Sequence, residues 1–149
     1  MTKKESRSTI SALFKYTGAL PKTLDDKGRF ILPIDFTGDK AAPIEFLFIA
    51  DKSKKIVTAF NTATLQTIEP EQIQTIAPHS WIATADKQDR ITIPKHIQDT
   101  LIVENNRNIV LVGRGEYFEI WKKEDWAKEN DDIETARQAI LAQFRQDIP

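Results

Sequence analysis

Apolar and polar residues alternate along much of this chain, the pattern typical of half-buried β-strands. Two runs rich in β-branched and aromatic residues, IEFLFIADKSKKIVTAF and NIVLVGRGEYFEIW, each enclose a polar turn and predict β-hairpins. SWIATA and RITIP predict further strands, as do FKYTGALPKTLD and RFILP, where proline favours an edge or the end of a strand. The sequence therefore predicts a β-rich fold.

Helical spacing is limited to a few segments. In NTATLQTIEPEQIQTIA, Asn61 could cap one short helix and Pro70 could begin a second, and KHIQDTL predicts one or two helical turns. The segment KKEDWAKENDDIETARQAILAQFRQDI predicts one long helix. Its apolar residues fall roughly on one side: Trp126, Ile133, Ala136, Ile140, Leu141 and Phe144. We expect an α+β fold with short helices and a C-terminal helix.

One phrase occurs twice, as TLDDKGRFILP from Thr23 and as TADKQDRITIP from Thr84. Each half of the chain reads strand, charged loop, strand ending in proline, short helix, hairpin and longer helix. Because each half is too small to bury its sheet alone, we expect both halves to complete one shared β-core. The expected divisions are a mobile N-terminal arm (1–17), a first repeat (18–77), a second repeat (78–130) and the remainder of the C-terminal helix (131–149).

Both copies of the phrase place an arginine four residues after an aspartate, in the pairs Asp25–Arg29 and Asp86–Arg90. An ion pair at this spacing can fix the shape of a tight loop. These residues leave two interpretations open: the pair only stabilises the turn, or the loop also presents basic side chains to phosphates and base edges. In the strands that follow, a period of two predicts four core residues: Phe30, Leu32, Ile91 and Ile93.

Charge is balanced overall but uneven along the chain. The 149 residues carry a net charge of −1, with about +3 in residues 1–36 and about −4 in residues 115–149. This asymmetry fits a protein with one face toward a polyanion, but charge also scatters unevenly in small proteins, so it does not identify a partner. The absence of cysteine excludes disulfides and suits a reducing cytoplasm. No stretch approaches the roughly 18 apolar residues of a spanning helix, so we expect a cytoplasmic protein with no membrane partner.

Other chemical motifs are weak. The two histidines, His79 and His96, lack the spacing of a metal site, and GRGE is a turn and no nucleotide-binding motif. Nothing pairs a nucleophile with a base. We expect no enzyme activity, cofactor, metal or small-molecule substrate. Three tryptophans could stack on bases, but at the ends of strands and helices they more often lie in a core or subunit interface: Trp81, Trp121 and Trp126.

Three segments, GALPKTLDDKGRFILP, ADKQDRITIP and IVLVGRGEYFEIWKKEDWAKE, together resemble the MraZ family of bacterial transcriptional regulators, within the SpoVT-AbrB-like swapped-hairpin group. The resemblance covers about residues 18–130. It implies two tandem AbrB-like units forming one shared double-split β-barrel, assembled as a homo-oligomeric ring. It also implies a sequence-specific DNA-binding regulator of the division and cell-wall gene cluster. Such a protein would be cytoplasmic and nucleoid-associated, with double-stranded promoter DNA as its partner.

The resemblance also assigns roles to residues of the repeated phrase. Arg29 and Arg90 would contact DNA, flanked by Lys27 and Lys87. The loops would be shaped by three residues: Asp25, Gly28 and Asp86. Asp89 stands where the family usually has glycine. It adds a negative charge beside Arg90, so we expect weaker DNA contact by the second loop, although aspartate tolerates a left-handed backbone better than most residues.

Two alternatives remain. The protein is an oligomeric scaffold or protein-interaction member of the fold that has lost DNA binding, as Asp89 and the acidic last helix would allow, or it is an antitoxin-like AbrB-fold protein. In each case we expect self-association. The two predicted hairpins carry more apolar surface than one small barrel needs, and the excess should face a neighbouring subunit.

Overall fold

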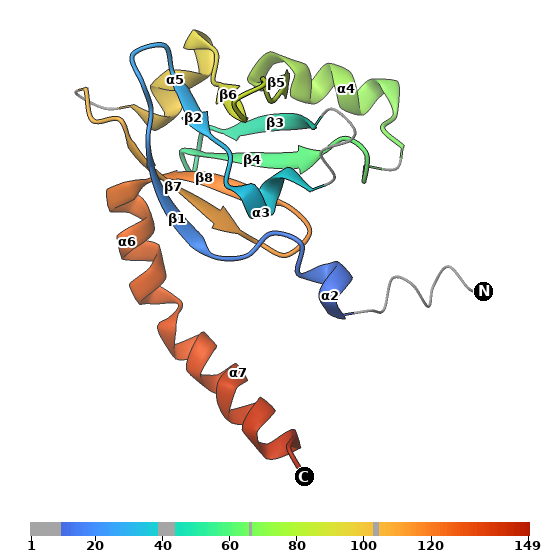
Figure 1. Ribbon diagram of the computed structural model, residues 1–149, viewed down its shortest axis with the longest axis vertical. Coiled ribbons are helices and arrows are strands. Elements are labelled where there is room, and N and C mark those ends of the chain that lie inside the picture. The colour runs from blue at the N-terminus through green and yellow to red at the C-terminus, as the bar shows by residue number, and fades with distance from the viewer. Residues whose placement is uncertain (1–9, 39–43, 66, 103–104) are drawn as a thin grey trace.

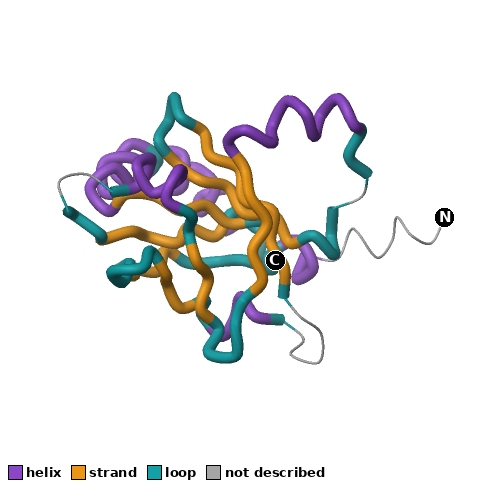
Figure 2. Tube along the Cα trace, turned by 90° about the horizontal axis from the view of Figure 1, so that it is seen from above, coloured by secondary structure: helices purple, strands orange, loops and turns teal. Residues whose placement is uncertain are grey.

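The computed structural model describes residues 10–38, 44–65, 67–102 and 105–149, which form a strand-rich α+β fold (Figure 1). The strands are β1 (Ala19–Thr23), β2 (Arg29–Ile31), β3 (Glu45–Asp51), β4 (Ile56–Asn61), β5 (Ser80–Thr84), β6 (Arg90–Thr92), β7 (Asn108–Gly113) and β8 (Phe118–Lys122). The helices are α2 (Ile10–Leu13), α3 (Ile34–Thr37), α4 (Pro70–Ile76), η1 (Ala77–His79), α5 (Lys95–Leu101), α6 (Lys123–Asp132) and α7 (Glu134–Asp147). Seen from above, the strands gather in the middle and the helices lie at the periphery (Figure 2).

Strands from the two halves of the chain alternate in one open antiparallel sheet. Its order is β1-β7-β8-β4-β3-β5, and β2 pairs with β6 in a separate two-stranded ribbon. The edge strand β1 of the first half pairs with β7 of the second half, and β5 pairs with β3 in the reciprocal way. The strands of the first half correspond to those of the second, β1 to β5, β3 to β7 and β4 to β8. Interchanging the corresponding strands gives the same strand order read in reverse. The two halves have therefore exchanged their edge strands.

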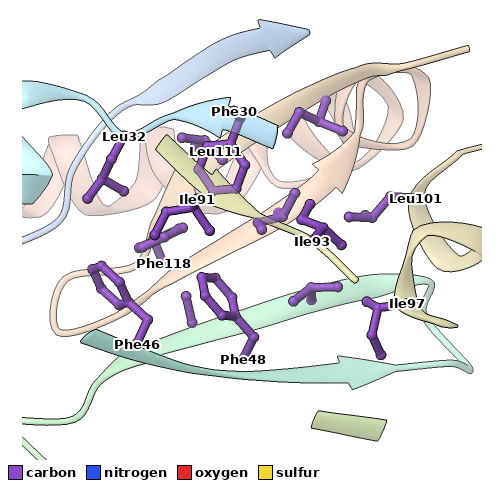
Figure 3. Packing of buried hydrophobic residues seen from close by; sticks show 14 of the residues in the cluster. Phe30, Leu32, Phe46, Phe48, Ile91, Ile93, Ile97, Leu101, Leu111 and Phe118 are labelled. Atoms are coloured by element: carbon purple, nitrogen blue, oxygen red, sulfur yellow. The ribbon is translucent and has the colours of Figure 1, made fainter. Parts of the chain in front are cut away.

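The core lies between the ribbon and the six-stranded sheet. All four side chains predicted from the repeated phrase are buried, with Phe30 and Leu32 each 2% exposed and Ile91 and Ile93 fully buried. Figure 3 shows Phe30 and Ile91 near sheet residues that include Phe118. Burying one such side chain contributes about 1.5–3 kcal/mol, so the ribbon is held to the sheet mainly by its inward face.

Tyr16 anchors the N-terminal segment to this core. Its side chain is fully buried, and its ring centroid lies 5.1 Å from that of Phe36 and 5.7 Å from that of Phe118. Its backbone bridges to Gly115. Burial raises the pKa of the Tyr16 hydroxyl, which accepts a hydrogen bond of 3.3 Å from the Asn61 side chain. Tyr16 lies within the expected arm, so at least this part of residues 1–17 belongs to the folded body.

Pro70 begins α4, as predicted. The preceding residue, Glu69, forms a capping box with Gln72, in which the Glu69 backbone N–H donates to the Gln72 side chain at 2.8 Å. The prediction that Asn61 caps a helix was wrong. Asn61 ends β4, and its side-chain oxygen accepts the backbone N–H of Ala63 at 2.9 Å, the geometry of an Asx turn.

The C-terminal segment forms two helices, so the prediction of one continuous helix was wrong. The break falls at Ile133, where φ is −94° and ψ is 2°. The last turn of α6 contains acidic residues and no basic residue, which opposes the helix dipole and favours termination. Helix α6 packs through Trp126 onto Trp121 at the outer face of the sheet, with ring centroids 5.4 Å apart. Helix α7 extends away from the body (Figure 1).

The apolar surface of the hairpins is mostly covered. Inward-facing residues of β3, β4, β7 and β8 belong to the main core, and outward-facing Val110 and Val112 pack in the second cluster with Trp121. The large exposed apolar side chains lie elsewhere, for example Phe14 after α2, Ile82 on β5 and Phe144 on α7. The expectation that the hairpins carry the excess apolar surface was therefore wrong about its location.

A candidate nucleic-acid interface

One carboxylate organises each charged loop. In the first loop, Asp25 Oδ1 accepts the backbone N–H groups of Lys27 at 2.9 Å and Arg29 at 2.8 Å. Its Oδ2 accepts Arg29 Nε at 2.7 Å. The carboxylate therefore both closes the loop and holds the guanidinium group of Arg29.

The second loop repeats this arrangement. Asp86 Oδ1 accepts the backbone N–H groups of Gln88 at 2.8 Å and Arg90 at 2.9 Å, and Oδ2 accepts Arg90 Nε at 2.8 Å. The ion pair expected from the four-residue spacing is present in both copies. Each pair uses the Nε donor of a guanidinium group that carries four further N–H donors.

These hydrogen bonds stabilise the ionised form of each aspartate. The backbone N–H of Arg29 is the main reason why the pKa of Asp25 lies below its ordinary value, and the Arg29 side chain adds to the effect. The backbone N–H of Arg90 lowers the pKa of Asp86 in the same way. The carboxylates are thus held ionised by loop geometry first and by the neighbouring cation second.

A left-handed residue occupies the same position in each loop. Gly28 has φ of +76°, and Asp89 has φ of +62°. Asp89 thus adopts the conformation that was expected to be tolerated. The carbonyl of Gly28 accepts the N–H of Ile93 at 2.8 Å, and that of Asp89 accepts the N–H of Leu32 at 2.7 Å. Both residues therefore join the loops to the opposite strand of the ribbon.

Gly28 is also constrained by packing. A Cβ atom at this position would lie 2.1 Å from Gln98 Nε2, on α5, and 3.0 Å from the carbonyl oxygen of Ile93. Gln98 Nε2 itself donates to that carbonyl at 2.7 Å. A side chain at residue 28 would therefore require Gln98 to move and to give up its hydrogen bond to the Ile93 carbonyl.

The ribbon places both arginines on one outward face. Its register pairs Arg29 with Thr92 and Ile31 with Arg90, while the inward residues between them are buried. Arg29 and Arg90 are diagonal neighbours, with Cα atoms expected about 7–8 Å apart. Ile31 is 56% exposed beside them. Sequence reasoning did not include Ile31 and Thr92 in the site, although strict alternation from the core residues would have placed them there.

The two flanking lysines lie in the loops. Lys27 and Lys87 are exposed, and because β2 and β6 are antiparallel, the loops that carry them enter the ribbon from opposite ends (Figure 1). The predicted site residues thus form one surface with arginines at its centre and a lysine toward each end.

The tryptophans considered for base stacking pack against other side chains of the protein. Trp81 stacks on Phe48 with ring centroids 4.5 Å apart, and Trp126 lies under the guanidinium of Arg114 at 5.5 Å. Within the described ranges, the side chains form no group of three or more potential metal ligands. No helix in these ranges is long and apolar enough to cross a membrane.

This chain is therefore an α+β protein whose two halves exchange edge strands. It carries two arginines on the outward face of a two-stranded β-ribbon. A family model described as "MraZ protein, putative antitoxin-like" matches residues 82–145. A relative from Desulforapulum autotrophicum is 31% identical over 124 residues, which cover 75% of this chain and 83% of that protein. A relative from Tropheryma whipplei is 27% identical over 130 residues, covering 81% and 90% respectively.

A third relative, from Oenococcus oeni, is 30% identical over 121 residues, covering 74% of this chain and 83% of that protein. All three relatives are named transcriptional regulator MraZ. The chain belongs to the MraZ family, and the resemblance seen in its sequence is confirmed.

Proposed function

We propose that the protein is a sequence-specific DNA-binding transcriptional regulator. The observation that carries this proposal is the outward face of the ribbon, where Arg29 and Arg90 lie together and each is held by a carboxylate. The major groove of DNA is about 12 Å wide and admits a two-stranded β-ribbon. A guanidinium group binds guanine or phosphate through paired N–H donors. The names of the relatives support the regulatory role.

Each site residue has a role in this proposal. Arg29 and Arg90 contact base edges or phosphates at the centre of the ribbon, and Lys27 and Lys87 contact phosphates toward its ends. Three residues give the loops their shape: Asp25, Gly28 and Asp86. Fixing the arginines before binding reduces the side-chain entropy lost when DNA is engaged.

The architecture proposed for this function is a double-split β-barrel. Residues 18–77 and 78–130 would be tandem AbrB-like units, with the β2–β6 ribbon closing over the open sheet. The strand order, which is the same when the halves are interchanged, supports this proposal. The matching hydrogen bonds of the two loops support it as well.

A homo-oligomeric ring would supply the affinity that one subunit lacks. A single ribbon offers few cations, and the whole chain carries a net charge of −1, so one subunit would neutralise few phosphates. A ring repeats the ribbon at fixed spacing, so that each further contact becomes intramolecular and overall affinity rises. Exposed apolar side chains such as Phe14, Ile82 and Phe144 offer surface for contacts between subunits.

The proposed target is the promoter of the division and cell-wall gene cluster, reached in the cytoplasm at the nucleoid. The direct experiment is a gel shift with duplex DNA from upstream of the protein's own gene, compared with an unrelated duplex of equal length. We expect the upstream duplex to shift at lower protein concentration and the complex to dissociate as salt rises. Binding of neither duplex would contradict the proposal and favour the oligomeric scaffold.

An antitoxin-like role is the second candidate, favoured by the description of the matching family model. In that case the protein would bind a toxin protein as well as its own promoter. The two candidates differ in whether a second polypeptide is needed for tight promoter binding. The purified chain alone should shift the upstream duplex if it is a self-sufficient regulator.

A further inference from the structure

The two loops have opposite charge environments despite their matching geometry. Thr23, before the first loop, pairs with Asn108, whereas Thr84, before the second loop, pairs with Glu45. One residue earlier in β1, Lys22 pairs with Ile109. The residue of β5 that corresponds to Lys22 is Ala83, which is uncharged. The same strand pairings identify the other residues that correspond to each other beside the two loops.

Three cationic residues of the first flank have uncharged counterparts in the second. The residues Lys22, Arg107 and Lys123 correspond to Ala83, Ile44 and Thr62. The first flank also carries Glu124, whose counterpart is Ala63, and the second flank has Glu45 in place of Asn108. The difference is about three charges between surfaces that have the same backbone arrangement.

Arg107 is tied directly to the first loop. Its Nη1 donates to the carbonyl oxygen of Asp25 at 2.9 Å, and its own carbonyl accepts the N–H of Leu24 at 2.9 Å. In the second half, the carbonyl of Ile44 accepts the N–H of Ala85 at 3.0 Å, but the guanidinium group has no equivalent. Among the described residues, this additional positive charge beside the first loop therefore has no counterpart beside the second.

A hollow of about 390 Å³ lies next to this flank. It is lined by Pro21, Lys22, Thr23, Ile31, Asn108 and Lys123. Two of these lining residues are lysines, and none carries a carboxylate. Ile31 also belongs to the outward face of the ribbon. Glu124 follows Lys123 but accepts the Asn106 side chain at 3.1 Å and is not part of the lining. The hollow thus continues the arginine face onto a surface rich in donors.

We propose that Lys22 and Lys123, at the rim of this hollow, bind backbone phosphates of the DNA that the ribbon contacts. The inference rests on the proposed function and adds that each subunit has a defined orientation on the DNA. These additional phosphate contacts lie beside the first loop and have no counterpart among the described residues beside the second, so each subunit docks asymmetrically on DNA. Contacts of this kind position the protein and carry no sequence information.

The test compares the double variant Lys22→Gln/Lys123→Gln with the charge-matched control Lys15→Gln/Lys128→Gln, whose lysines are exposed elsewhere. Fluorescence anisotropy would measure affinity for the upstream duplex and an unrelated duplex over a range of salt concentrations. For each bound subunit, we expect the slope of log affinity against log salt to become shallower by about two units. Affinity should fall by a similar factor, about fivefold or more, for both duplexes.

Loss of binding should occur without loss of folding, because Lys123 is exposed and Lys22 is half-buried, so thermal midpoints should match the control. A Lys22/Lys123 variant with the affinity and salt slope of the control would overturn the inference while leaving the proposed function intact, provided that Arg29→Ala still weakens binding. Wild-type protein that binds neither duplex would overturn both.

Discussion

Asp25 and Asp86 each accept two backbone N–H groups on one oxygen, so loop shape depends on a single ionised side chain. The same hydrogen bonds lower the pKa of each carboxyl from its ordinary value of 3.8. A group whose pKa is lower in the folded state contributes stability above its unfolded pKa and loses it as pH falls through the folded pKa. Both loops should therefore keep their shape at neutral pH and loosen only below about pH 3.8.

Carbon-13 NMR titration of the two carboxyl groups tests this prediction. We expect both midpoints to lie below 3.8. The variants Asp25→Asn and Asp86→Asn should lose this part of the acid dependence of unfolding, because an amide does not ionise in this range. Carboxyl midpoints at or above the ordinary value would contradict the hydrogen bonding described for the loops.

Gly28 should be intolerant of a side chain. The substitution Gly28→Ala places a Cβ in a left-handed conformation, which costs about 1–2 kcal/mol, and pushes against Gln98 and the Ile93 carbonyl. Gly18→Ala is a control, since φ there is also positive, at +93°, but a Cβ would make only an ordinary contact of 3.7 Å with Leu20. Urea denaturation should show Gly28→Ala to be the more destabilising of the two. Equal losses would mean that Gln98 moves aside without cost.

Core residues of the repeated phrase were predictable, and the packing demand on Gly28 was not. Alternation alone identified Phe30 and Ile91 as buried, because a strand with one face on a core has a period of two. The contact between Gly28 and Gln98 joins residues far apart in sequence. No local pattern encodes such a contact.

At the scale of elements, turn chemistry predicted the hairpins well. Polar turns between β-branched runs correctly indicated β3–β4 and β7–β8. The exchange of edge strands between the halves was not encoded in any local signal, since it depends on which strands meet in space. The break at Ile133 was also missed, because apolar spacing continues through it while the acidic end of α6 opposes continuation.

Gly113 fixes the N-terminal segment to the sheet. A Cβ at this residue would lie 2.4 Å from the carbonyl oxygen of Tyr16 and 2.5 Å from backbone atoms of Thr17, so backbone must move to accommodate it. Overpacking of this kind typically costs about 1–3 kcal/mol. Gly113→Ala should lower the free energy of unfolding and increase hydrogen exchange at the Gly115 amide, which donates to the Tyr16 carbonyl. Unchanged exchange at that amide would contradict the anchoring role of this contact.

The whole molecule exposes apolar side chains away from its core, most clearly on α7. Ile140 is 50% exposed and Phe144 is 58% exposed, and no residue of α7 is buried. If these side chains contribute to the proposed ring, light scattering at micromolar concentration should give a mass well above the 17.0 kDa of one chain. Ile140→Ser/Phe144→Ser should lower that mass with little change in the thermal midpoint, because these positions contribute little to the core.

A 17.0 kDa species for the wild-type protein would rule out the ring. If the double variant keeps the mass of the wild-type assembly, α7 does not form the contact between subunits. The surfaces around Phe14 and Ile82 would then be the next candidates for that contact. The assembly itself was inferred from excess apolar surface, and the structure places the large exposed apolar side chains outside the hairpins, on the terminal segments and on β2, α3, α4 and β5.

The two arginine loops are proposed to bind DNA as well as to stabilise their turns. Salt-dependent affinity, measured together with the thermal midpoint, separates these two roles for Arg29→Ala and Arg90→Ala, with Lys128→Ala as a control. Each ion pair is partly exposed, with arginine side chains 25% and 33% accessible, so its loss should change stability little.

We predict that both arginine variants stay folded and bind the upstream duplex more weakly than the control does. The salt slope should become shallower by about one unit for each engaged subunit. Arg29→Ala should be the more damaging, because Asp89 already offsets Arg90 and the first loop has the basic flank. A strong drop in thermal midpoint for both substitutions, with binding falling only in proportion to unfolding, would contradict DNA contact by these arginines.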